Sequence, residues 1–336
     1  MTLKEMGEEL GISPSTISKV LNGCTKNFTI PDELRSRILT HVEERGYSPN
    51  PVFRSMRVNK NKQIACFFYS RSSYMTGNTA ELSLDAAILH LEKLNYEVYY
   101  QFCTQARKSG YPQPNWKVAG ILIPDVSSAD QLIALEKKNQ SYVAINGVCG
   151  PQGTAVQADE IQNMKLTLEH LYELGHQRIA YVYRAAKHQE LMRHYSSAER
   201  LSSYYNFMKE LNLEPIVIEA VMDAPEWKRH ILEIAPSAVI AGDESLGSRL
   251  FRAAYDKGMK IPEDMSMIVF NDADYLASMV PAISSVRIPA YEMGSLAGQI
   301  MEAKIKDPTY DMGITHRLQG KLILRETTAR LKTFTV

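Results

Sequence analysis

The sequence has few cysteines and no pair of them at a spacing that binds metal. Four cysteines occur in 336 residues, at Cys24, Cys66, Cys103 and Cys149, and none belongs to a C-x-x-C motif. We therefore expect reduced packing residues, with no disulfide and no metal site. The chain also lacks an apolar run of the ~18 residues that a transmembrane helix needs. Its first ten residues carry four charges where a signal peptide would have an apolar segment, so we expect a cytoplasmic protein with no membrane partner.

Motifs of several common enzyme classes are also missing. No G-x-G-x-x-G opens a helix after the first apolar strand-like run, and no P-loop, H-E-x-x-H or G-x-S-x-G occurs. These absences argue against dinucleotide-dependent enzymes, P-loop nucleotide hydrolases, zinc proteases and serine hydrolases. We expect a protein that is not an enzyme, with no catalytic residues and no cofactor.

The chain carries no net charge, but its basic residues are unevenly distributed. Lysine plus arginine and aspartate plus glutamate each number 38. The first 62 residues hold ten basic against seven acidic side chains, and no acidic residue lies between Glu44 and Glu81. A basic N-terminal segment on a neutral body suits a polyanion partner for that segment alone, although a solvated basic linker would have the same composition.

The first 46 residues have the periodicity of three short helices. Leu3, Met6 and Leu10 recur at spacings of three and four residues and form one apolar face. Pro14 suits the first position of a second helix, and a third helix begins near Pro31. The sequence therefore predicts a small all-α unit at this end of the chain.

The turn between the first two segments has the residues of a helix-turn-helix. Gly11 can end the first helix in a left-handed conformation, and Ser13 can accept hydrogen bonds from the first amides of the second. Gly7 is small enough for the two helices to cross closely. This arrangement places a second helix in the major groove of DNA, although a three-helix segment without a nucleic-acid partner would share the apolar pattern.

From residue 64 onward, strand-like apolar runs alternate with helical patterns. The runs lie at 64–69, 96–102, 120–124, 142–146, 179–183, 238–241 and 266–270. Helical spacing separates many of them, as at Leu84, Ile88 and Leu91. The alternation predicts parallel sheets with helices on both faces, and a length of about 270 residues favours two lobes over one.

The sequence resembles the lactose/galactose repressor family over nearly its whole length. The segment Thr2–Gly23 is similar to the helix-turn-helix of that family, and Ile30–Met56 is similar to its third helix and hinge. Further similar segments follow in the family's order, at 171–182, 196–211, 260–272, 283–294 and 322–328.

The resemblance implies a small all-α helix-turn-helix domain followed by a two-lobed α/β effector domain, which is periplasmic-binding-protein-like (type I) with parallel sheets. It places the DNA-binding domain at 1–46, a hinge at 47–63 and the effector-binding and dimerisation domain at 64–336. The N-lobe would comprise about 64–159 and 290–318, and the C-lobe about 160–289 and 319–330.

The resemblance also assigns DNA contacts to the second helix and its surroundings. Lys19 can donate to guanine O6 or N7, with a phosphate contact as the alternative. Pro14 has no amide hydrogen and no polar side chain, so it offers shape or contact with a thymine methyl. The expected DNA-contacting residues of this region are Thr2, Pro14, Ser15, Thr16, Ser18, Lys19 and Asn22.

The hinge departs from the family at two positions. Met56 stands where the family wedges a leucine into the minor groove, and methionine can serve as such a wedge. Arg54 and Arg57 are expected at backbone phosphates. Phe53 replaces a customary alanine, and its bulk argues against close approach of two hinge helices.

The effector site is expected between the lobes, at the carboxyl ends of the strands. Arg200 matches the arginine that commonly clamps the effector, and one arginine among amides and carboxylates suits a polyhydroxylated ligand such as a sugar. Alternatively, Arg200 pairs with Glu199 or another surface carboxylate, and the strand-end Asn and Asp residues only cap helices. The expected effector-binding residues are Tyr69, Arg71, Asn146, Arg200, Asp243 and Asn271.

The resemblance implies a sequence-specific transcriptional regulator, commonly a repressor, whose operator affinity is modulated by an effector. It also implies a homodimer, with the helix at about Thr79 to Leu94 in the subunit interface. Two departures, Gly242 for an asparagine and Asn271 for an aspartate, keep open a DNA-binding regulator with a degenerate, ligand-free core. A solute-binding protein is the remaining alternative.

Overall fold

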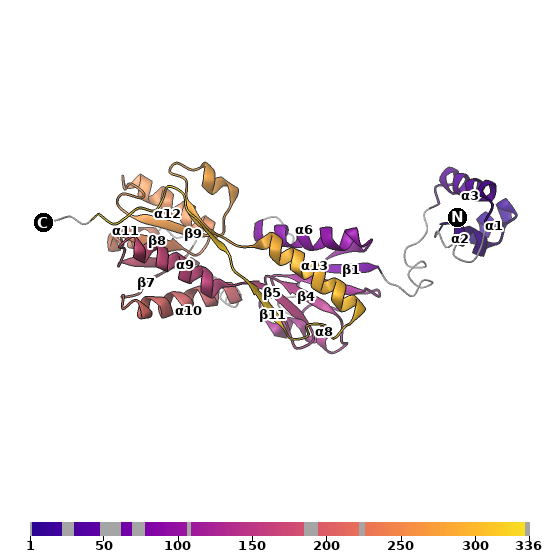
Figure 1. Cartoon of the computed structure of the whole chain (residues 1–336), viewed down its shortest axis with the longest axis horizontal. Coiled ribbons are helices and arrows are strands. Elements are labelled where there is room, and N and C mark those ends of the chain that lie inside the picture. Colours follow the sequence, from indigo (N-terminus) through magenta and orange to yellow (C-terminus); the bar gives the residue numbers. More distant parts are fainter. Residues whose placement is uncertain are drawn as a thin grey trace. The chain divides into compact units, whose positions relative to one another are not determined.

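The chain folds into two units, Met1–Asn61 and Lys62–Val336 (Figure 1). The computed structural model describes residues 2–21, 30–47, 62–68, 78–105, 109–184, 194–221 and 226–332. Within those residues, no helix is both long enough and apolar enough to span a lipid bilayer.

The first unit contains the three helices that the apolar spacing predicts. They are α1 (Leu3–Leu10), α2 (Pro14–Leu21) and α3 (Asp32–Glu44). Buried apolar side chains from all three form one core, to which the described residues contribute Met6, Ile17, Val20 and Ile38. Since this core is small, the ends and turns of the helices matter for its stability.

Close packing and capping define the turn between α1 and α2. Gly11 ends α1 in the left-handed region, with φ 66°. The amide of Thr16 donates to the Ser13 hydroxyl at 3.2 Å, which caps the start of α2. A Cβ on Gly7 would lie 2.7 Å from the carbonyl oxygen of Ile12, so the crossing requires glycine. The structure confirms all three expectations for this turn.

The second unit contains two sheets, and every neighbouring pair of strands in the first sheet is parallel. Within the described residues its strand order is β11-β5-β4-β3-β1-β2. The strands are β1 (Gln63–Phe68), β2 (Glu97–Phe102), β3 (Gly120–Pro124), β4 (Tyr142–Ile145), β5 (Thr154–Ala158) and β11 (Thr315–Leu318). We call this sheet, with α6 (Asn78–Lys93), α8 (Ile133–Glu136) and α13 (Ala290–Lys306), the N-lobe.

The second sheet is parallel except for one edge strand, β12, which runs antiparallel to β10. Its order over the described residues is β12-β10-β9-β8-β6-β7. The strands are β6 (Ile179–Arg184), β7 (Ile216–Ala220), β8 (Ala238–Ala241), β9 (Ser266–Phe270), β10 (Ser284–Arg287) and β12 (Lys321–Ile323). With α9 (Glu160–Glu173), α10 (Tyr195–Glu210), α11 (Glu226–Ile234) and α12 (Glu244–Asp256), this sheet forms the C-lobe. These lobes confirm the predicted parallel-sheet α/β architecture.

The chain passes between the two sheets three times. Strands β1 to β5 belong to the first sheet and β6 to β10 to the second, after which β11 returns to the first and β12 to the second. Helix α13 lies between β10 and β11 in the chain and packs on α6. A Cβ on Gly294 would overlap the carbonyl oxygen of Ser83, so glycine permits this helix contact.

Three strand ends turn sharply through residues with positive φ. Asp125 follows β3 with φ 54°, Asn146 follows β4 with φ 53°, and Asn271 follows β9 with φ 66°. Asparagine and aspartate tolerate the left-handed region better than most residues. The carboxyl ends of the two parallel sheets therefore present short polar side chains where the chain leaves each strand.

Candidate functional site

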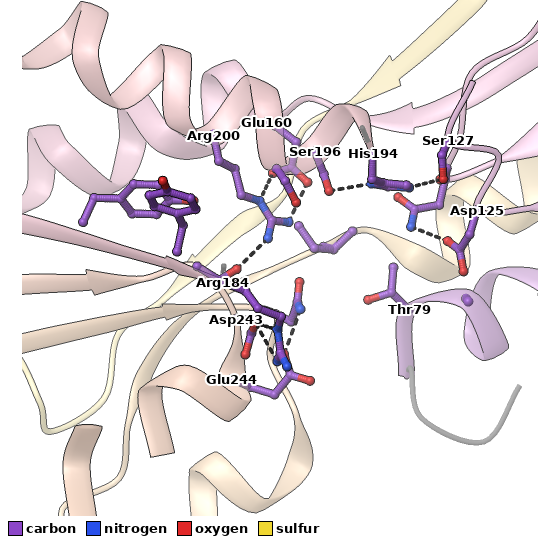
Figure 2. A pocket seen from close by; sticks show the side chains of 18 residues that line it. Thr79, Asp125, Ser127, Glu160, Arg184, His194, Ser196, Arg200, Asp243 and Glu244 are labelled. Carbon is purple, nitrogen blue, oxygen red and sulfur yellow. Dashed lines mark hydrogen bonds and ion pairs between the residues drawn. The ribbon is translucent and has the colours of Figure 1, made fainter. Parts of the chain in front are cut away.

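A cavity of about 350 Å³ lies between the N-lobe and the C-lobe (Figure 2). Asp125, Ser127 and Asn146 line it from the N-lobe, at or near the ends of β3 and β4. The C-lobe contributes residues from the ends of β6, β8 and β9 and from the first turns of α9 and α10. This location is the ligand position expected for open parallel sheets, and the volume is large enough for a small polar molecule.

Arg200 lines the cavity but is already paired inside the C-lobe. Its Nε donates to Glu160 Oε2 at 2.9 Å and its second terminal nitrogen donates to Glu160 Oε1 at 2.6 Å, so the pair is bidentate (Figure 2). The other terminal nitrogen donates to the Gly242 carbonyl oxygen at 2.9 Å. Its guanidinium carbon also lies 4.3 Å from the centre of the Phe270 ring. Burial lowers the pKa of Arg200, but the Glu160 carboxylate outweighs burial and the pKa lies above its ordinary value, so Arg200 stays charged.

Asp243 holds a second arginine of the cavity while it caps a helix. Arg184 donates from Nε at 3.0 Å and from a terminal nitrogen at 2.9 Å to the same oxygen, Oδ2 of Asp243 (Figure 2). The other carboxylate oxygen accepts the amide of Leu246 at 2.8 Å and caps α12. Asp243 therefore both lines the cavity and acts as the helix cap that its strand-end position allows.

Asn146 is one residue through which the N-lobe contacts the C-lobe beside the cavity. Its side-chain amide donates to Asp125 Oδ1 at 2.8 Å, and its side-chain oxygen accepts the Tyr195 hydroxyl at 2.9 Å. His194 Nε2 bonds the Asn146 carbonyl oxygen at 2.8 Å. A carbonyl oxygen only accepts, so Nε2 carries hydrogen, and in the neutral ring Nδ1 accepts the Ser196 hydroxyl at 2.7 Å.

The first turns of α10 make two further contacts between the lobes. The Tyr195 hydroxyl accepts the amide of Ala158, the last residue of β5, at 2.9 Å. Burial raises the pKa of Tyr195, so the phenol stays neutral and can also donate to Asn146. Arg317 on β11 makes a bidentate pair with Glu199 at 2.6 and 2.7 Å. Helix α10 therefore touches both the cavity and the opposite lobe.

Asn271 lines the C-lobe side of the cavity. Its side-chain amide donates to Glu244 Oε2 at 2.8 Å. The next residue, Asp272, is 4% exposed and accepts hydrogen bonds from Arg325, Arg287 and Ser285. This network joins the end of β9 to β10 and to the C-terminal segment.

Comparisons with known proteins cover both units. A periplasmic binding protein-like domain matches residues 168–328. The chain is 26% identical over 337 residues to the transcriptional regulator GalR of Streptococcus thermophilus. The matched region covers 97% of this chain and 99% of that protein. The lac repressor dimer, solved with operator and the anti-inducer ONPF, matches with a TM-score of 0.80 at 18% identity over 98% of this chain and 99% of that one. The chain is thus similar over nearly its whole length to regulators of the lactose/galactose repressor (LacI/GalR) family.

A third similar protein was solved with a ligand. It is a LacI-family regulator from Enterococcus faecium with bound ribose, which matches with a TM-score of 0.63 at 20% identity over 80% of this chain and all of that one. The curated relative is named as a regulator of transcription and not as an enzyme, which agrees with the prediction from the missing catalytic motifs.

Four of the six expected effector residues line the cavity. They are Asn146, Arg200, Asp243 and Asn271. Tyr69 and Arg71 lie outside the described residues. The alternative pairing of Arg200 with Glu199 or another surface carboxylate is wrong, because its partner is the buried Glu160 and Glu199 pairs with Arg317.

Five of the expected DNA-contacting residues lie on α2. Pro14 and Ser15 are exposed, whereas Thr16, Ser18 and Lys19 are half-buried. The Ser13 hydroxyl bonds those of Ser15 and Thr16 at 2.9 and 2.8 Å. Thr2 is exposed and forms a capping box with Glu5 at the start of α1. Asn22, Arg54, Met56 and Arg57 lie outside the described residues, as does Phe53.

Sequence reasoning did not single out several residues of the cavity wall. Glu160, Arg184 and Glu244 occupy the ends of β5, β6 and β8 or the first turns that follow them. Asn146 was expected in the site because it follows a predicted strand. The same reasoning, applied to the end of every strand, would have identified these three residues. His194 and Ser196 follow no strand directly, so their sequence positions gave no indication of the site. His194 precedes α10 and Ser196 lies in its first turn, far in sequence from the N-lobe residue Asn146 that His194 contacts.

Proposed function

We propose that this chain is a sequence-specific DNA-binding transcriptional regulator, acting as a repressor, whose operator affinity changes when an effector binds between its lobes. The observation that carries the proposal is the full-length similarity to a transcriptional regulator, which spans the helical unit and both lobes together. A solute-binding protein has no use for the N-terminal helices. We place the protein in the cytoplasm, since it acts on DNA.

The DNA-binding role is assigned to residues 1–46, with α2 as the recognition helix. Its first residues, Pro14 and Ser15, are exposed and would meet base edges, with Lys19 one turn later. Thr2, Thr16, Ser18 and Asn22 are assigned to phosphates, which fix the register without reading sequence. Residues 47–63 are assigned as the hinge, with Arg54 and Arg57 at phosphates and Met56 as a minor-groove wedge.

Effector binding and dimerisation are assigned to residues 64–336. The proposed effector site comprises Tyr69, Arg71, Asn146, Arg200, Asp243 and Asn271. A cavity lined by hydroxyls, amides and carboxylates suits a polyhydroxylated ligand, and the ribose-bound relative supports a sugar. Helix α10 and the preceding His194 contact the N-lobe beside the cavity, so a ligand in the cavity can change the angle between the lobes. The hinge connects the lobes to the DNA-binding helices, so this change of angle would alter operator affinity.

The regulator is proposed to act as a homodimer that addresses two half-sites. The lac repressor relative was solved as a dimer on its operator. Helix α6 supplies a candidate surface, because Leu82 and Leu89 lie seven residues apart on it and are 52% and 49% exposed. Two recognition helices would then meet half-sites about one helical turn apart.

Selection of duplexes from a random pool by the full chain, with and without a metabolite extract, tests the proposal. We expect enrichment of a sequence with two related half-sites, and a change in enrichment when the extract is present. No preference for any duplex over random competitor at moderate salt, in either condition, would contradict it. A parallel selection with Lys19→Ala shows whether the enriched sequence depends on α2.

A further inference from the structure

The edge of Arg200 that would bind an anion is already occupied. Arginine binds carboxylates and phosphates through two parallel N–H groups, and Glu160 takes that arrangement at 2.9 and 2.6 Å. A third N–H group donates to the carbonyl of Gly242, and the guanidinium face lies over Phe270. Both N–H groups of the Nε edge are therefore taken by Glu160, and one nitrogen of the opposite edge is engaged by the Gly242 carbonyl.

Glu160 cannot be displaced cheaply by an incoming anion. Its side chain is 1% exposed and that of Arg200 is 9% exposed, so the pair is desolvated in the folded protein. The amide of Asn163 also donates to Glu160 Oε2, at 3.4 Å. Separating such a pair leaves a buried carboxylate without a counter-ion, which is strongly unfavourable. An anionic ligand would have to compete with a partner that is fixed in place.

The second arginine of the cavity is neutralised in the same way. Arg184 is paired with Asp243, whose other oxygen is engaged in capping α12. Asp125 and Glu244 add two more carboxylates to the described lining. Both guanidinium groups of the described wall are therefore paired with carboxylates before a ligand binds.

We propose that Glu160 is a specificity-determining residue, whose carboxylate occupies the anion-binding edge of Arg200 and restricts the cavity to effectors without negative charge. The inference rests on the proposed function, in which this cavity binds the effector. It excludes sugar acids and sugar phosphates and selects neutral or aminated polyols. Removal of the Glu160 carboxylate is then expected to open an anion site.

Chemical rescue of Glu160→Ala tests the proposal in the full chain. The variant leaves a carboxylate-sized space beside Arg200, so acetate should raise its Tm by about 2 °C or more, in a concentration-dependent manner. Acetamide, a neutral molecule of the same shape, should not. Wild type and the matched variant Glu169→Ala should respond equally to the two compounds, since Glu169 lies on the same helix but is half-exposed in a surface pair with Lys165. Equal responses in Glu160→Ala would overturn the proposal.

A measurement on the wild-type chain keeps the proposal testable if Glu160→Ala does not fold. Tm is measured with matched ligand pairs, such as glucose and glucuronate, galactose and galacturonate, and ribose and ribose 5-phosphate. No anionic member should stabilise the chain more than its neutral parent does. An anionic sugar that does so, and that changes operator affinity, would overturn this inference while it leaves the proposed regulator intact. If the chain does not bind DNA, the proposed function as a regulator is contradicted, whereas the acetate test of Glu160 remains valid.

Discussion

The two units of this protein use polar side chains in different ways. On α2 and its turn, the described polar contacts include bonds between small hydroxyls, from Ser13 to Ser15 and Thr16. In the cavity of the second unit, the polar groups are charged and fixed in bidentate or multiple contacts, as in Arg200 with Glu160. Hydroxyl groups on an exposed helix can exchange partners for a phosphate or a base at little cost, whereas buried ion pairs cannot.

This difference matches the two tasks proposed for the units. A surface that meets many non-specific DNA sites before its operator benefits from side chains that rearrange easily. A cavity that must respond to one ligand benefits from groups whose positions and charges are set before binding. The same comparison predicts that substitutions in the cavity cost folding stability, whereas substitutions on α2 cost DNA affinity.

The largest expected effect comes from breaking the buried pair in the cavity. Arg200→Ala leaves Glu160 buried without a partner and should lower the free energy of unfolding by about 3–5 kcal/mol. Urea unfolding of the full chain measures the loss, and Arg252→Ala, which removes an exposed pair with Asp256, is the control with less than about 0.5 kcal/mol expected. Arg200→Ala should also abolish the effector response while it spares ligand-free operator affinity. A normal response would remove Arg200 from the site.

A second test uses the buried carboxylate at the end of β9. Burial raises the pKa of Asp272, but hydrogen bonds from Ser285, Arg325 and Arg287 outweigh it, so the pKa lies below its ordinary value. Its contribution to stability is therefore present at neutral pH and is lost as pH falls through the folded-state pKa. Asp272→Asn should cost about 2 kcal/mol at pH 7, and the difference from wild type should shrink on acidification. A difference that is constant with pH would contradict this assignment.

Lys19→Ala addresses the DNA-binding side of the comparison. It should weaken operator binding by about 1–3 kcal/mol if Lys19 reads a base edge, with little change in folding stability. Anisotropy titrations with operator and random duplexes measure the two affinities, and Lys4→Ala on the exposed side of α1 is the control. Equal weakening on both duplexes would reassign Lys19 to a phosphate contact.

The smallest expected effect concerns the cap of α1. Thr2→Ala removes the hydroxyl that accepts the Glu5 amide, which should cost about 1 kcal/mol of stability. Thr2→Ser keeps the hydroxyl and should behave as wild type. If Thr2 also contacts a phosphate, Thr2→Ala should weaken operator and random DNA alike. No change in stability would argue against the capping role.

The helices of the first unit could be predicted because their signals are local. Gly11 and Ser13 mark one turn within three residues, and the spacing of Leu3, Met6 and Leu10 identifies one face of a helix. In the second unit, each of the seven apolar runs corresponds to a strand. The run at 96–102 nevertheless forms an edge strand with exposed Tyr99, Tyr100 and Phe102, because an apolar run does not reveal a strand's place in its sheet.

Other parts of the fold and site could not be predicted from local pattern. Strands β10, β11 and β12 are three or four residues long, and most of their residues are polar or half-exposed. They have no apolar pattern of their own, so pairing with neighbouring strands determines that they form strands. Asn146 and Arg200 could be placed in the cavity by strand position and family resemblance. The pairing of Arg200 with Glu160 joins residues 40 positions apart, and only the packing of α9 against α10 brings them together.

The most direct test of the account is the operator affinity of the full chain, measured by anisotropy across a panel of uncharged sugars. We expect at least one sugar to change the operator Kd by about 5–150-fold, and the operator to change the Kd of that sugar by the same factor, because coupling between two sites is reciprocal. A chain that binds its selected operator with the same Kd in the presence of every sugar would contradict the account.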